Sequence, residues 1–144
     1  MLSSTMSKYI KIIFYSSISI FVFLILIIFT PLNEYLVFLF PYLFVVSFLL
    51  GIALLVLSKR GVKEEKLRRL LIINGISLAG IPLLSVLHNL FYALEQLVEN
   101  VFLTNVISYL GILFFILSVI VCPIVFLGTI VWIFTLYLKE LRRI

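Results

Sequence analysis

The chain contains one histidine, His88, and no other side chain in it has so wide a chemical repertoire. An imidazole can relay a proton, ligate a bound group or contact a lipid headgroup, and ionisable side chains in membrane-embedded segments are costly and often functional. The alternative is a neutral histidine that hydrogen-bonds to Ser85 or to a residue of another helix and serves packing alone. His88 and the neighbouring Asn89 are therefore the first residues to test for function.

His88 belongs to a stripe of polar side chains in the otherwise apolar segment 67–95. At about 100° per residue, the stripe lies within about 60° of one line along a helix, with Asn89 beside it. The candidate functional residues of this segment are Asn74, Ser77, Ser85, His88, Asn89, Tyr92 and Glu95. Such a stripe on a membrane helix predicts either a functional site or a packing surface.

The segment 106–138 and the residues just before it carry a second stripe of small and polar residues. Its members lie within about 40° of a common line. They are Thr104, Ser108, Gly111, Ser118, Cys122 and Thr129. We expect the two stripes to face each other or a shared interior, because small residues and interhelical hydrogen bonds hold helices together in lipid.

The residue types argue against several kinds of site chemistry. Ser85, three residues before His88, is in reach of it on a helix, but nothing supplies the orienting third group and oxyanion hole of nucleophilic catalysis. Zinc takes three or four protein ligands, and one histidine and one cysteine cannot supply them unless identical chains meet at an axis. We therefore predict no catalytic residue, no metal and no cofactor.

Composition sets the class of protein and the positions of the helices. Hydrophobic residues make up 65% of the 144 residues and charged residues 12%, with a mean hydropathy of +1.36, which predicts an integral membrane protein. We expect one domain, residues 1–144, that is an all-α bundle of four transmembrane helices. The expected spans are 12–30, 35–57, 70–94 and 106–138. The last run would be about 50 Å long as a straight helix, so it is either one long tilted helix or two short spans broken near Pro123.

The distribution of charge favours four spans. All 11 lysine and arginine residues lie in the N-terminal segment, in the loop 58–69 or at the C-terminus, and four spans put all of them on one side. The opposite loops contain only Glu34, Glu95 and Glu99. By the positive-inside rule both termini are expected in the cytoplasm, which places His88 towards the outer leaflet. The net charge of +5 therefore has a topological explanation, and we expect no nucleic acid as a partner.

Carboxylates are absent from the middle of the predicted spans. This argues against a standard proton-coupled or sodium-coupled transporter, and against an exchanger of the small multidrug-resistance type, whose first helix needs a buried glutamate. Small residues instead mark contact faces. Ser47, Gly51 and Ser58 share one face of the second span, and Gly75 and Ala79 form a pair that could seat another helix or another copy of the chain.

The sequence of the third span also resembles that of known membrane proteins. Residues 66–82, KLRRLLIINGISLAGIP, followed by 87–93, LHNLFYA, resemble a recurring pattern in small, uncharacterised four-helix membrane proteins of bacteria and archaea. The resemblance implies that the elements G-x-S-x-x-G and L-H-N-x-x-Y-A belong together. It brings no activity with it and assigns no role to His88 or Asn89.

Three functional hypotheses follow from the sequence. The leading one is a non-enzymatic, multi-pass protein of a prokaryotic cell membrane that acts as a structural or accessory partner, as a homo-oligomer or with other membrane subunits. The second is a channel or transporter with a polar path along the third and fourth helices. The third is a lipid-binding protein or membrane enzyme that uses His88. Membrane lipids are expected partners under each.

Overall fold

The protein is all-helical over the residues that its computed structural model describes, which are 7–30 and 36–141. In chain order the elements are α2 (Lys8–Phe29), the 3₁₀ turn η1 (Val37–Leu39), α4 (Phe40–Gly61), α5 (Glu65–Glu95), α6 (Val101–Ile116), the π-helical turn η2 (Leu117–Val121) and α7 (Cys122–Leu141). Four helical stretches in this part of the chain are long and apolar enough to cross a membrane. The predicted all-α fold, with four helices long and apolar enough to span a membrane, is confirmed.

Local sequence signals set the helix boundaries. The Ser7 side chain accepts a hydrogen bond from the backbone N–H of Ile10 at the start of α2. Pro41 lies in the first turn of α4, where its missing N–H costs no helical hydrogen bond. Asn100 caps α6 by accepting from the backbone N–H groups of Phe102 and Leu103 at 3.0 and 3.2 Å. Because of this cap, α6 begins five residues before the apolar run that was expected to form the fourth span.

The last apolar run forms one continuous helix from Val101 to Leu141. Pro123 has no N–H and its ring crowds the carbonyl four residues earlier, which normally kinks or breaks a helix. Here the wider π-helical turn η2 directly precedes it, and the backbone N–H of Cys122 donates to the carbonyl of Leu117, five residues back. Of the two alternatives left open by the sequence, the structure has the single helix.

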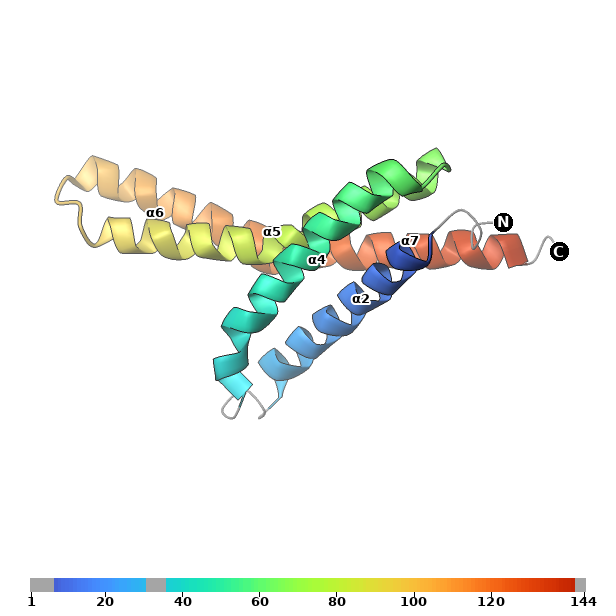
Figure 1. The fold of residues 1–144 in the computed structure, drawn as a ribbon. Coiled ribbons are helices and arrows are strands. Elements are labelled where there is room, and N and C mark those ends of the chain that lie inside the picture. Colours follow the sequence, from blue (N-terminus) through green and yellow to red (C-terminus); the bar gives the residue numbers. More distant parts are fainter. Residues whose placement is uncertain (1–6, 31–35, 142–144) are drawn as a thin grey trace.

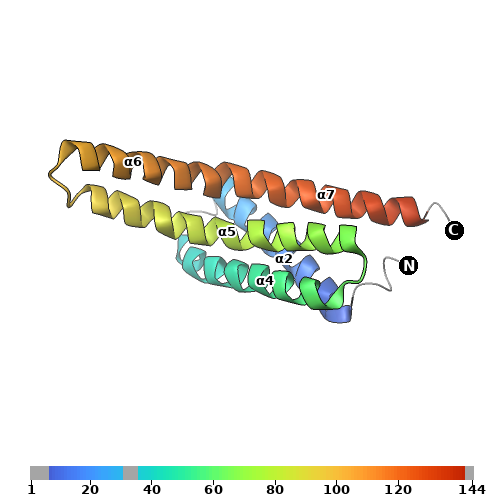
Figure 2. The ribbon, with the colours of Figure 1, turned by 90° about the horizontal axis from the view of Figure 1, so that it is seen from above.

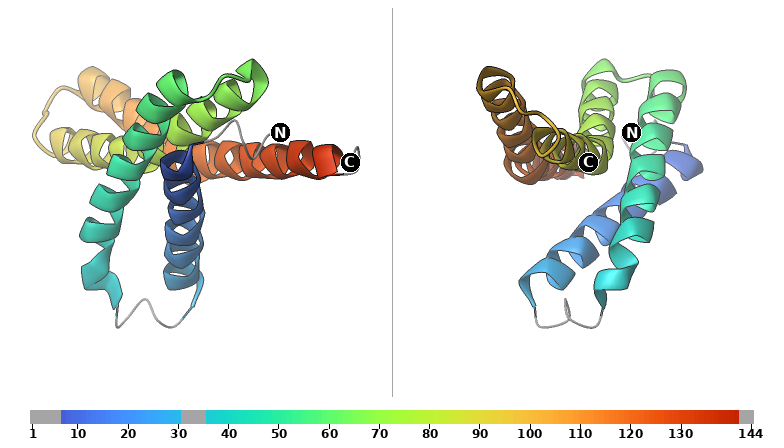
Figure 3. Two further views of the ribbon diagram at one scale, coloured as in Figure 1. Left: turned by 45° about the vertical axis from the view of Figure 1, so that its right-hand side comes forward. Right: turned by 90° about the vertical axis from the view of Figure 1, so that its left-hand side faces the viewer.

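The helices form two antiparallel hairpins that diverge from a shared end (Figure 1). One hairpin is α2 with α4, and the other is α5 with the continuous α6–η2–α7 helix, which run side by side in Figure 2. In the left view of Figure 3 the hairpin of α2 and α4 projects downwards, away from the line of α5, α6 and α7. The first half of α5 therefore packs against α4 as well as α7, whereas residues 83–95 of α5 pack against α6 beyond the reach of the first hairpin.

The hydrophobic core lies at the shared end of the hairpins. One cluster there joins buried side chains of all four long helices and of the loop after α4: Ile10, Phe14, Leu54, Val62, Leu67, Leu71 and Ile133. A second cluster brings Phe21 of α2 onto Phe126 of α7, with ring centroids 4.5 Å apart. From residue 83 to residue 125 only Gly111 and Ser118 are buried. Residues 83–95, the turn 96–100 and α6 thus form an extension, here named the arm, in which two helices pack only on each other.

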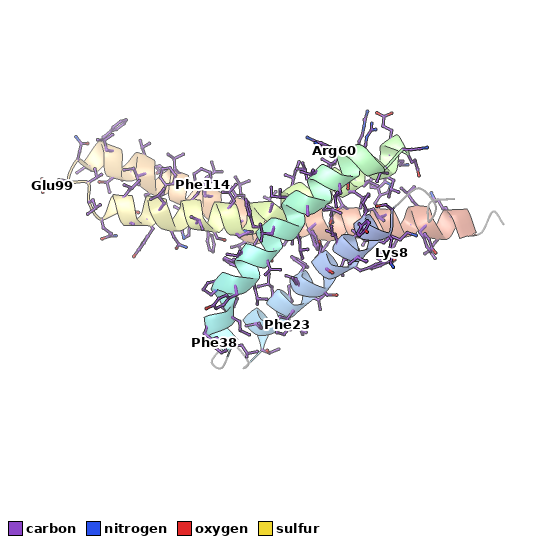
Figure 4. The ribbon with its side chains drawn as sticks, in the orientation of Figure 1. Lys8, Phe23, Phe38, Arg60, Glu99 and Phe114 are labelled. Carbon is purple, nitrogen blue, oxygen red and sulfur yellow. The ribbon has the colours of Figure 1, made fainter. Side chains whose placement is uncertain are left out.

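Basic side chains gather at the shared end, together with Glu64 and Glu65, whereas Glu95 and Glu99 lie at the tip of the arm. Lys8, at the start of α2, and Arg60, near the end of α4, are labelled at the shared end in Figure 4, and Glu99 is labelled at the tip of the arm. The first turns of α5 and the end of α7 add further lysines and arginines to the shared end. Glu34 and residues 142–144 lie outside the described residues.

α4 and α5 approach each other closely at three small residues. A Cβ atom built on Gly51 would lie 2.6 Å from the carbonyl oxygen of Gly75 and 2.8 Å from Cβ of Ala79. The reciprocal Cβ on Gly75 would lie 2.7 Å from the carbonyl oxygen of Gly51. The small pair Gly75 and Ala79 thus seats α4 of the same chain, through the face that Gly51 shares with Ser47 and Ser58.

Candidate functional site

The deepest polar contact between the two stripes joins Asn74 of α5 to Thr129 of α7. The Asn74 side chain is fully buried, and its Nδ2 donates to Thr129 Oγ1 at 2.7 Å and to the carbonyl oxygen of Phe126 at 3.2 Å. The Thr129 hydroxyl donates in turn to the same carbonyl at 2.8 Å. Asn74 Oδ1 is buried with no hydrogen-bond partner in the described part of the chain. This contact fixes α5 and α7 to each other near the middle of the molecule.

A second contact joins Ser85 of α5 to Ser118 of the π-helical turn. Their hydroxyl oxygens lie 2.6 Å apart, and the Ser118 hydroxyl donates to the carbonyl oxygen of Ile81 at 2.8 Å. Because Ser118 has one hydroxyl proton and uses it towards Ile81, Ser85 is the donor in the pair. The π-helical turn, which accommodates Pro123, thereby also places Ser118 in contact with α5.

His88 binds the backbone of α6 and makes no hydrogen bond with Ser85. Its Nδ1 lies 2.9 Å from the carbonyl oxygen of Gly111, and its ring lies 5.2 Å, centroid to centroid, from that of Phe115. Of the two packing partners expected for this histidine, the structure has a residue of another helix. Because the Ser85 hydroxyl is engaged by Ser118, the two side chains do not form a nucleophile and base pair.

The contact with Gly111 predicts one tautomer for His88. A carbonyl oxygen can only accept, so the neutral ring must carry its proton on Nδ1 and leave the lone pair on Nε2. Because the chain has a single histidine, ¹⁵N spectra of histidine-labelled protein report this site alone. We expect the neutral ring to carry its proton on Nδ1 and to leave Nε2 unprotonated. A spectrum with the proton on Nε2 would show that the Gly111 contact does not form.

The remaining stripe residues have separate surroundings. Ser77 is buried and its hydroxyl donates within α5 to the carbonyl oxygen of Ile73 at 2.9 Å. Cys122 is half-buried against Gly80, where an added Cβ would lie 2.9 Å from its Sγ. The side chains of four members make no hydrogen bond within the described residues; Ser108 and Glu95 are half-buried, and Asn89 and Tyr92 are exposed.

The two stripes therefore meet at three points, which span Asn74 to His88 of α5. Three pairs of polar groups close the interface at 2.6–2.9 Å, and such distances leave no room for a water molecule between the partners. Within the part of the chain that the structure describes, no three histidine, cysteine or acidic side chains lie together in a group that could hold a metal ion. The geometry is that of a polar seam holding two helices together.

One feature that sequence reasoning missed is a groove where α7 runs beside the start of α5. The groove has a volume of about 280 Å³, and Lys66 of α5 lies over the Trp132 ring of α7 with its Nζ 5.5 Å from the centroid. The available signal was a face of α7 with Trp132 and Lys139 on it, seven residues apart. The sequence did not show which residue of α5 would oppose that face.

Comparison of the chain with protein-family models, with curated proteins and with solved structures finds no match. What the protein does therefore has to follow from its own geometry.

Proposed function

We propose that this chain is a non-enzymatic, multi-pass membrane protein that acts as a structural or accessory partner, binding other membrane helices through its arm. The observation that carries the proposal is Asn89, an exposed amide on a two-helix extension with no hydrogen-bond partner among the described residues. An amide left in lipid is unfavourable, and asparagine side chains in membrane helices gain partners by helix association.

The exposed face around Asn89 has the composition of a helix contact. Val86, Leu90 and Ala93 are exposed beside it and share its face of α5, within about 100° around the helix axis. The opposite face of this part of α5 is already occupied by α6, through His88 and Phe91. A further helix of a second copy, or of another membrane subunit, could therefore pack on this face without displacing any contact within the chain.

The polar seam supports this role over the two rival functions. A polar path within one copy would run between the stripes, where the side chains are bonded to each other and leave no space for an ion. Catalysis by His88 would need a reacting partner at Nε2, and Ser85 is bonded elsewhere. The charge distribution supports cytoplasmic termini, which would place the arm towards the outside of a prokaryotic cell membrane. The resemblance to small four-helix membrane proteins remains part of this proposal.

Site-specific photocrosslinking in intact membranes tests the proposal. A photoreactive amino acid would replace Val86 or Ala93, which flank Asn89, and in a control it would replace Leu49, which is 59% exposed on α4. We expect protein adducts from the two arm positions and only lipid adducts from Leu49. A product at twice the mass of the chain indicates a second copy, and any other mass indicates a different membrane protein.

Substituting Asn89 by leucine should weaken the same adducts. Hydrogen bonds between membrane helices contribute about 0.6 kcal/mol on average and about 1.7 kcal/mol at most, so we expect association to fall by about threefold to twentyfold. The side chain is exposed, so the stability of the chain itself should not change by more than about 0.5 kcal/mol. Lipid adducts alone at both arm positions, in a folded protein, would contradict the proposed function.

A further inference from the structure

The groove beside Trp132 runs along one face of α7 and changes character along its length. Lys66 of α5 and six residues of α7 line it, the latter being Gly128, Val131, Trp132, Thr135, Leu136 and Lys139. From Gly128 to Lys139 the groove spans about 16 Å along the helix axis. The groove is cationic near the shared end of the hairpins, where the basic residues gather. It is apolar at its other end, beside Gly128 and Val131.

The apolar end of the groove is open beside Gly128. A Cβ atom built on Gly128 would have no other atom within 4 Å, so nothing of the described chain fills the space beside it. Val131 is 65% exposed next to it. An extended hydrocarbon chain could therefore lie along this part of α7 without any rearrangement.

The polar end holds two cations that face the groove. The Lys66 ammonium lies over the Trp132 ring, which orients it but leaves its donors available, since a ring face accepts no full hydrogen bond. Lys139 lies in the last turn of α7 and makes no ion pair within the described residues. The ion pair between Glu65 and Arg69 at the start of α5 includes neither lysine.

We propose that this groove binds an anionic phospholipid, with the headgroup phosphate between Lys66 and Lys139 and one acyl chain along Val131 and Gly128. Two lysines supply the charge that a phosphate needs, and a tryptophan between the polar and apolar ends matches the level of the headgroup–hydrocarbon boundary. Free phosphate would satisfy the lysines and leave the apolar end empty. The site goes beyond the proposed function and lies at the opposite end of α5 from the arm, so either can fail without the other.

Trp132, the only tryptophan in the chain, reports directly on this groove. The full chain would be reconstituted in vesicles of phosphatidylcholine to which phosphatidylglycerol with brominated acyl chains is added, because bromine quenches tryptophan fluorescence only at short range. The reference measurement uses brominated phosphatidylcholine with the same acyl chains. We expect the brominated phosphatidylglycerol to quench Trp132 at lower mole fraction than the phosphatidylcholine, with the difference shrinking as salt is raised.

Substitutions of the two lysines should remove this selectivity. We expect apparent affinity for phosphatidylglycerol to fall about fivefold for each of Lys66→Gln and Lys139→Gln. The matched control is the double variant K59Q/K63Q, because both of these lysines are exposed at the same end of the molecule and neither lines the groove. Its selectivity should stay near that of the unaltered chain.

Three outcomes would overturn the proposal. The first is equal quenching of the unaltered chain by both brominated lipids. The second is a preference for phosphatidylglycerol that survives in K66Q/K139Q, which would assign the preference to the general positive charge of this end. The third is loss of the preference on adding inorganic phosphate inside and outside the vesicles, at fixed ionic strength, which would indicate a site for free phosphate. Size-exclusion profiles of the variants, each a single folded peak, complete the test.

Discussion

Replacing Gly51 by alanine should separate α4 from α5 and destabilise the fold more than its single added methyl group suggests. The new Cβ would meet the carbonyl oxygen of Gly75 and the backbone nitrogen and Cβ of Ala79 at 2.6–2.8 Å, distances that real Cβ atoms essentially never show. Two of these three atoms are backbone, so no change of side-chain rotamer relieves the contact. The helices have to move apart.

Moving α4 away from α5 disturbs much of the core. α4 contributes Leu54 to the cluster at the shared end, and the same cluster holds Ile10 and Phe14 of α2. Overpacking a well-packed contact costs about 1–3 kcal/mol and occasionally more. We expect Gly51→Ala to reduce the free energy of unfolding in detergent micelles by about 3 kcal/mol, measured by denaturant titration of helical circular dichroism.

Two glycines of the same chain provide graded controls for Gly51→Ala. Gly128→Ala adds a Cβ with no atom within 4 Å, so it should be neutral or, because alanine favours helix, stabilising by up to about 1 kcal/mol. Gly80→Ala meets only Cys122 Sγ closely, and this sulfur can rotate away, so its cost should be intermediate. If Gly51→Ala and Gly128→Ala unfold alike, the close approach of α4 and α5 does not contribute to stability.

The number of helices follows from the sequence because charge and length act together. A run of 33 apolar residues permits one span or two, and the one-sided distribution of lysine and arginine favours one. The structure has one helix there, and the π-helical turn η2 allows this helix to continue beyond Pro123. A π-helical turn has no sequence signature of its own, so its position, and with it the place of Ser118, could not be predicted.

The divergence of the two hairpins could not be predicted either. In a soluble protein the apolar face of each helix indicates what it packs against, but here nearly every face is apolar, so periodicity does not distinguish a neighbour from lipid. The pairs of small residues were visible in the sequence on both α4 and α5. That Gly51 packs on Gly75, and so sets where α4 and α5 cross, depends on the three-dimensional approach of two backbones.

The candidate site was predictable where both partners are side chains. Asn74 and Thr129 belong to the two stripes, and the structure joins them. The partner of His88 is a backbone carbonyl, that of Gly111, and a backbone acceptor is present at every position and so leaves no sequence pattern. Ser85 and Ser118 also belong to the two stripes, but that Ser85 bonds to Ser118 and not to His88 became clear only from the structure.

Asn74→Asp should be the most disruptive change in the polar seam, although it alters only one group of the side chain. Asn74 Nδ2 donates to Thr129 Oγ1 and to the carbonyl oxygen of Phe126, and a carboxylate oxygen in that place can donate to neither. A carboxylate at the centre of a membrane helix costs about 2.5–3.5 kcal/mol even when neighbouring groups can adjust. We expect a loss of about 3 kcal/mol or more in unfolding free energy at neutral pH.

Asn74→Leu should cost far less than Asn74→Asp, and the difference isolates the role of polarity from that of volume. Leucine has a similar size, and it also removes Oδ1, a buried acceptor that has no partner in the described part of the chain. Replacing a partly satisfied buried polar group by an apolar one of the same shape can be nearly neutral. Thr129 keeps its own bond to the Phe126 carbonyl, so the leucine variant leaves no new unsatisfied hydroxyl.

A double-mutant cycle of Asn74→Leu with Thr129→Val then measures the interhelical bond itself. We expect a coupling free energy of about 0.6–1.7 kcal/mol, the range found for hydrogen bonds between membrane helices. Ser77→Ala is the matched control, because the Ser77 hydroxyl is bonded within its own helix and should show no coupling to Thr129. A coupling near zero for Asn74 and Thr129 would mean that the seam contributes little stability. In that case its polar residues would have to be explained by function, and His88 would be the first of them to substitute.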